Sequence, residues 1–280
     1  MIIHGYSSNL YVWQERYKMD GLDDSMEAIL RGCAEAGLDA VEPPPKPEVY
    51  ALVAANGLRA SGSYLGLALH EPYEALAVDA VVRPAAELLA QAGGTDFILN
   101  PNAKRVGAEP VQLKSEHELK RQGDNMTRIA RLVEPLGLKV SMHNHAAAYE
   151  LADGDLRSVT AYAGPEVGLC VDTGWAHTAG HDPLEWVRRY PARVFGFHFR
   201  NQFGAVPTEH LLEGEIDIAG LIGLLRDIGY AGWLSLELWQ PKQTEPKLPM
   251  AEDVRRSIAY LRELVAGCGG DGGGGGGLAR

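Results

Sequence analysis

The stretch SMHNHAAAYE, residues 141–150, sets two histidines around an asparagine, with a glutamate five positions after the second histidine. His143 and His145 follow LGLKV, an apolar run of strand length, so both stand where a predicted strand ends. Imidazole and carboxylate groups bind transition metals and transfer protons near neutral pH. The alternative interpretation is a polar loop without chemistry. Similar groups at the ends of other strands would favour a functional site.

Three later apolar runs end in the same kinds of side chain. VGLCVD ends at Asp172, VFGFHF contains His198, and LSLEL contains Glu237. Burying such charges without compensation is costly, and one divalent cation would compensate all of them together. Mixed imidazole and carboxylate ligands suit Mn²⁺, Co²⁺, Fe²⁺ or Zn²⁺. A metal of this kind polarises a carbonyl or a pair of hydroxyls.

The order of the elements predicts that these strand ends meet. Short apolar runs alternate with longer helical stretches, and strands separated by helices run parallel. The predicted strands are 1–7, 38–44, 58–67, 95–102, 138–145, 167–175, 193–202 and 232–239. The predicted helices are 24–37, 46–57, 73–94, 115–137, 151–165, 182–191, 217–230 and 250–267, with a kink or break expected at Pro84.

Eight strand–helix units close into a single (β/α)₈ TIM barrel, whose functional side chains lie at the C-terminal ends of the strands. A doubly wound open sheet is the alternative, but no glycine-rich phosphate-binding turn follows the first strand. We assign residues 1–266 to the barrel and 267–280 to a flexible glycine-rich tail.

Charge and composition restrict the classes of binding partner that we expect. A net charge of −11 argues against a nucleic-acid partner and suits a small neutral substrate together with a bound cation. We find neither an apolar run of about 20 residues nor a basic, apolar leader, so we expect a cytoplasmic protein without a membrane partner. The three scattered cysteines fit free thiols in a reducing compartment. Homo-oligomerisation stays open.

Taken together, the motifs HNH…E, VDTGW…AGHDP, FGFHFRNQ and LELW resemble the xylose isomerase-like TIM-barrel superfamily. Within it, the chain is most similar to the sugar phosphate isomerase/epimerase group, which includes inosose dehydratases and ketose 3-epimerases. The resemblance implies one divalent metal, with Mn²⁺ first and Mg²⁺, Co²⁺, Fe²⁺ or Zn²⁺ as alternatives. Its ligands would stand at the ends of strands five to eight, at His143, Asp172, His198 and Glu237.

One of these positions departs from the family pattern, because many members have glutamate where this chain has His143. Ketose 3-epimerases of this family use two metal-bound glutamates as their proton-transferring groups. The resemblance implies that this chain keeps one of the two, at Glu237. A metal-bound imidazole is a poor general base. His145 or Glu150 would therefore replace the missing base, and Glu150 is also an alternative ligand or substrate contact.

Five further residues are candidates for substrate contacts: Arg200, Trp175, His177, His70 and Glu42. Arg200 stands where the family often has lysine, and a cation there can stabilise an enolate. Trp175 stands where relatives often have histidine, so it can form an apolar wall or simply pack in the core, and His177 is then the nearest imidazole. His70 and Glu42 follow earlier strands and can line the pocket or lie on loops.

The resemblance implies an enzyme, a metal-dependent isomerase or epimerase of a small sugar, keto-sugar or polyol acting through a metal-bound enediolate. The alternative is a metal-dependent lyase, either an inosose dehydratase-like enzyme or one that performs β-elimination on a 3-keto-glycoside. Endonucleases that act at abasic DNA sites share the fold, but the acidic charge opposes DNA binding. A carbohydrate-binding barrel without activity is disfavoured by the intact ligand positions.

Overall fold

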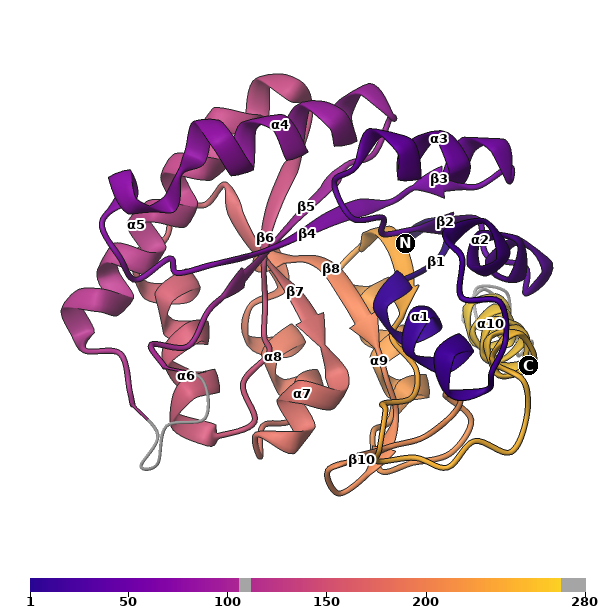
Figure 1. Ribbon diagram of the computed structural model, residues 1–280. Coiled ribbons are helices and arrows are strands. Elements are labelled where there is room, and N and C mark those ends of the chain that lie inside the picture. The colour runs from indigo at the N-terminus through magenta and orange to yellow at the C-terminus, as the bar shows by residue number, and fades with distance from the viewer. Residues whose placement is uncertain (106–111, 268–280) are drawn as a thin grey trace, which may run out of the picture.

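The computed structural model describes residues 1–105 and 112–267 of the 280-residue chain. A parallel sheet of seven strands curls around a central axis, and helices surround it (Figure 1). In the order in which they lie, the strands are β1 (Ile2–Ser8), β11 (Ala231–Leu236), β8 (Val194–Phe199), β7 (Val167–Asp172), β6 (Lys139–His143), β5 (Asp96–Pro101) and β4 (Gly62–Leu67). The final strand, β11, lies beside the first, as a closed barrel requires.

Two short strands complete the ring between β1 and β4. β2 (Ala40–Val41) pairs in parallel with β3 (Arg59–Ala60), which leads through Ser61 into β4. On the other side of β2, the amides of Asp39 and Glu42 donate hydrogen bonds to backbone carbonyls of β1, at 2.8 and 3.0 Å. The predicted (β/α)₈ barrel is therefore confirmed, with β3 and β4 together forming its third strand.

The helices on the outside of the barrel largely follow the predicted segments. They are α1 (Leu10–Met19), α2 (Met26–Glu35), α3 (Pro47–Ala55), α4 (Val78–Gln91), α5 (Glu116–Val133), α6 (Tyr149–Arg157), α7 (Thr173–Thr178), α8 (Pro183–Arg189), α9 (Ile218–Asp227) and α10 (Met250–Gly267). Among the described residues, no helix has the length and apolar character that crossing a membrane requires. The predicted tail, 267–280, lies outside the described residues except for Gly267.

Three local features differ from the sequence prediction. Residues 173–175, predicted as the end of the sixth strand, instead begin α7, because the Asp172 side chain caps a helix at this point. The predicted break at Pro84 is wrong, because α4 continues through this residue and the helical segment is instead interrupted at Ala77, which has a positive φ of 48°; the alternative of a kink at Pro84 stays a prediction. Pro84 is exposed, so water can satisfy the carbonyl that its missing N–H leaves unpaired. The third difference is α1, which lacks a clear amphipathic pattern and was not predicted; the side chain of Asn9 caps it by accepting a hydrogen bond from the Tyr11 amide at 2.8 Å.

An apolar core fills the space between the strands and the helices. Val140 and Met142 of β6, Val171 of β7 and Ile129 of α5 all belong to it and are almost fully buried. Burying a side chain of this size contributes about 1.5–3 kcal/mol each. This core fixes which strand residues face outward, and alternation then directs their neighbours into the barrel.

Residues that point into the barrel form two successive layers along β6, β7, β8 and β11. The lower layer consists of small residues, and the upper layer consists of imidazoles and carboxylates two positions further along each strand. The pairs, lower residue first, are Ser141 and His143, Cys170 and Asp172, Gly196 and His198, and Ser235 and Glu237. The strand period therefore brings all four candidate ligands to the same level of the barrel.

Candidate metal centre

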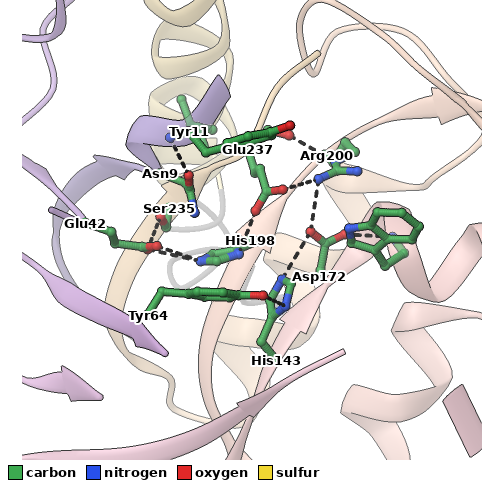
Figure 2. Close-up of polar contacts among 12 residues, drawn as sticks. Asn9, Tyr11, Glu42, Tyr64, His143, Asp172, His198, Arg200, Ser235 and Glu237 are labelled. Carbon is green, nitrogen blue, oxygen red and sulfur yellow. Dashed lines mark hydrogen bonds and ion pairs between the residues drawn. The ribbon is translucent and has the colours of Figure 1, made fainter. Parts of the chain in front are cut away.

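Four buried side chains from four neighbouring strands meet at the C-terminal end of the barrel (Figure 2). His143 ends β6, Asp172 ends β7, His198 belongs to β8, and Glu237 directly follows β11. Each offers one ligand atom, and these atoms all lie within 4.8 Å of one another. The strand register explains the convergence, because Asp172 lies opposite His198 in the β7–β8 pair.

The contacts within this group suit a cation. His143 Nε2 lies 3.5 Å from Asp172 Oδ2, and His198 Nδ1 lies 2.9 Å from Glu237 Oε2. Both nitrogens are buried, and neither has a hydrogen-bond partner among the described residues. Buried polar atoms are normally paired. Two unpaired imidazole nitrogens beside two carboxylate oxygens form a donor set that fits one divalent transition metal.

Asp172 is held in place by its neighbours. Its backbone N–H donates to Asn144 Oδ1, and Asn144 Nδ2 donates to its carbonyl, both at 2.9 Å. Asp172 Oδ1 accepts a hydrogen bond from the Trp175 amide at 2.7 Å and so caps α7. Oδ2 is the oxygen that faces His143. One oxygen of the Asp172 carboxylate therefore caps α7, and the other is the candidate metal ligand.

Arg200 is buried against two of the candidate ligands. Its Nη2 lies 3.4 Å from Asp172 Oδ2 and pairs with Glu237 Oε1, while its Nε donates to the Glu237 carbonyl at 3.0 Å (Figure 2). Burial alone would raise the pKa of Glu237, but the charge of Arg200 and the close contact with His198 lower it below its usual value. Arg200 therefore touches the carboxylates, and it is not among the residues that line the cavity above them.

Glu42 lies on the far side of His198 from Glu237 (Figure 2). Its two carboxylate oxygens are 3.1 and 3.0 Å from His198 Nε2, and Oε1 also accepts a hydrogen bond from Ser235 Oγ at 2.6 Å. Burial alone would lower the pKa of His198, but the charge of Glu42, together with the contacts of His198 with Cys170 and Glu237, raises it well above the usual value. The sequence left open whether Glu42 lines the pocket or lies on a loop, and the structure places its carboxylate inside the barrel against His198.

A cavity of about 410 Å³ opens above the four candidate ligands. Its lining consists of Asn9, Tyr11, Tyr64, His143, His145, Glu237 and Gln240. Tyr64 Oη lies 3.5 Å from His143 Nδ1. Four of these residues were not predicted from the sequence: Asn9, Tyr11, Tyr64 and Gln240. Asn9 directly follows β1, so the strand-end rule applied to the first strand would have found it.

His145 lies beside this cavity, between two other rings. Its ring centroid is 5.5 Å from that of His143 and 4.3 Å from that of Trp175. Part of His145 is exposed, yet packing among its neighbours lowers its pKa to about 4, with burial as the larger cause and the charge of His143 as the next. Trp175 also lies 5.6 Å from the guanidinium carbon of Arg200. The structure therefore brings His145 and Trp175 next to the candidate ligands.

Three other candidates lie away from the cavity. Glu150 is exposed in the first turn of α6, where it lines a separate groove with Lys114. His177 pairs with Glu215 at 3.0 Å outside the cavity. His70 is buried in the loop after β4 and is not among the cavity-lining residues. Glu150 and His177 lie on helices that follow strand ends, and His70 lies on a buried loop, so none of the three side chains lines the cavity.

Comparison with known proteins shows that the chain matches one family of TIM barrels. The model of the xylose isomerase-like TIM barrel family matches residues 30–264. The chain is 26% identical over 173 residues to the rhizopine catabolism protein MocC of Rhizobium meliloti, covering 55% of this chain and 51% of that protein. It is 24% identical over 149 residues to the inosose dehydratase of Geobacillus kaustophilus, covering 46% and 48%. The chain thus spans about half the length of the curated relatives that it matches.

Solved structures share the fold over almost the whole chain. A sugar phosphate isomerase/epimerase from Parabacteroides distasonis superposes with a TM-score of 0.70 at 18% identity, covering 94% of this chain and 97% of that one. The D-allulose 3-epimerase of Methylomonas sp. gives 0.69 at 17%, covering 94% and 98%. The IolI protein, whose structure contains a zinc atom, gives 0.67 at 16%, covering 94% and 98%. At these identities the likeness establishes the fold alone.

Proposed function

Because the chain belongs to the xylose isomerase-like TIM barrel family, we propose that it is a divalent-metal-dependent isomerase or epimerase of a small sugar, keto-sugar or polyol. The observation that carries the proposal is the buried group of two imidazoles and two carboxylates below an open cavity. Epimerases among the structural neighbours support the same reaction class. The inosose dehydratases among the relatives support the alternative, a metal-dependent lyase.

The cation would be held by the four ligand atoms that face one another, on His143, Asp172, His198 and Glu237. We propose Mn²⁺ first; the zinc atom in a structural neighbour makes Zn²⁺ a direct alternative, and Co²⁺, Fe²⁺ and Mg²⁺ follow. When bound, such a cation polarises a substrate carbonyl and its neighbouring hydroxyl.

The cavity above suits a neutral carbohydrate. Tyr11 and Tyr64 offer flat apolar faces, and Asn9 and Gln240 offer amide donors and acceptors for hydroxyl groups. The residues that line it in the described part of the chain include neither lysine nor arginine. A volume of about 410 Å³ is large enough for one monosaccharide and solvent. Trp175, beside His145, would extend the aromatic wall.

Proton transfer falls to Glu237 and His145, which line the same cavity. Arg200 keeps Glu237 ionised, so this carboxylate can accept the proton from the carbon next to the substrate carbonyl. If protonated Glu237 returned its proton to the neighbouring carbon, the product would be an isomer. If His145 instead relayed a proton from solvent to the other face of the same carbon, and Glu237 released its proton to solvent, the product would be an epimer. If a β-substituent departs before the proton returns, the reaction is an elimination. Glu150 lines a separate groove and not this cavity, so we assign it no step in the mechanism.

The decisive experiment incubates Mn²⁺-loaded protein in D₂O with a panel of ketoses, inososes and 3-keto-glycosides. Deuterium uptake without loss of mass indicates an isomerase or epimerase, whereas loss of water or an aglycone indicates a lyase. Metal-stripped protein is the control and should do neither. Equal turnover with and without metal would refute the proposal.

A further inference from the structure

Glu42 occupies a position that a substrate cannot reach. The ring of His198 separates it from the Glu237 side of the site, and Glu42 is absent from the cavity lining. The carboxylate oxygens of Glu42 are also outside the group of atoms that could hold the cation. Glu42 must therefore influence the candidate metal site through His198.

The contacts of Glu42 determine which ring nitrogen of His198 carries the proton. Both carboxylate oxygens lie at 3.0–3.1 Å from Nε2, so the carboxylate holds an Nε2–H and the lone pair of a neutral imidazole stays on Nδ1. Nδ1 is the buried atom without a hydrogen-bond partner, and it faces Glu237 Oε2 at 2.9 Å. We infer that Glu42 is a positioning residue that fixes the metal-binding tautomer and ring orientation of His198. This inference rests on the proposed function.

The lower layer of the barrel explains how a carboxylate fits there. Ser141, Cys170, Gly196 and Ser235 are small, and together with Glu42 they border a remaining void of only about 10 Å³. Ser235 also donates the hydrogen bond that anchors Glu42 Oε1 at 2.6 Å. Larger residues below the candidate ligands would exclude the carboxylate. The small residues and Glu42 therefore form one supporting structure beneath His198.

The test is the metal affinity of Glu42→Gln, measured by calorimetry with Mn²⁺ and with Zn²⁺. Glutamine keeps the size and one acceptor but removes the charge, so affinity should fall by about 10–100-fold, the usual effect of losing a carboxylate behind a ligating histidine. Asp96→Asn is the matched control, since Asp96 lines the same void but hydrogen-bonds Thr95 and contacts no candidate ligand. Its affinity should fall by less than about tenfold, because Asp96 acts on Glu42 and His198 only through its charge and, among the described residues, forms no hydrogen bond with either.

A second measurement does not depend on that variant folding. ¹⁵N spectra of histidine-labelled, Zn²⁺-loaded wild-type protein should show His198 protonated at Nε2 and bound through Nδ1. Ser235→Ala, which keeps the carboxylate but removes its donor, should weaken metal binding by less than Glu42→Gln does. Binding through Nε2, or unchanged affinity in Glu42→Gln, would overturn the inference while leaving the proposed function intact. Wild-type protein that binds no metal would overturn both.

Discussion

Replacement of Arg200 by methionine should destabilise the metal-free protein and enlarge the response to metal. Arg200 is 2% exposed and is the cation beside both Asp172 and Glu237. At the 3.4 Å that separates Nη2 from Asp172 Oδ2, one such pair is worth about 5 kcal/mol at an effective dielectric constant of about 20. Leaving a buried charge unpaired typically costs about 3–5 kcal/mol. For a domain of this size, that corresponds to a fall in Tm of roughly 6–20 °C.

A bound divalent cation would replace the lost positive charge. The rise in Tm on adding saturating Mn²⁺ should therefore be larger in Arg200→Met than in the wild type. Differential scanning calorimetry with and without metal measures both effects. Arg83→Met is the control, because Arg83 pairs with an exposed Asp79 and such a pair contributes less than about 1 kcal/mol. A metal-free Arg200→Met protein as stable as the wild type, or equal Tm shifts in the two proteins, would refute the reasoning.

Three further outcomes are expected. Asp172→Asn and Glu237→Gln should each purify with less metal by elemental analysis, since each loses a charged ligand. Full metal occupancy in both variants would refute the proposed metal site. His145→Ala should keep its metal but lose turnover, whereas His143→Ala should lose metal first; the reverse pattern would exchange their roles. Burial raises the pKa of Asp96 to about 7 from 3.8, so folding stability should fall as pH rises through this window. Asp96→Asn should flatten that dependence in urea titrations, and an unchanged slope would contradict it.

The sequence alone was enough to predict the barrel and the members of the central group. Parallel strands end at one edge, and inward-facing residues recur every second position, so His143, Asp172, His198 and Glu237 had to approach one another once their strands were recognised. The same rule applied to the first strand identifies Asn9. The helix after it, α1, escaped prediction because its polar and apolar residues do not separate into two faces.

Only the tertiary structure decided what the surrounding residues touch. Glu42 and His198 are 156 positions apart, and local patterns carry no information about which side of a ring so distant a carboxylate approaches. Arg200 follows His198 by two residues, yet its partners come from β7 and from the end of β11. Glu150 follows the histidine-rich stretch, but α6 directs it into another groove. Strand periodicity is a local property written in the chain, whereas these pairings depend on how eight strands close and how the following loops turn.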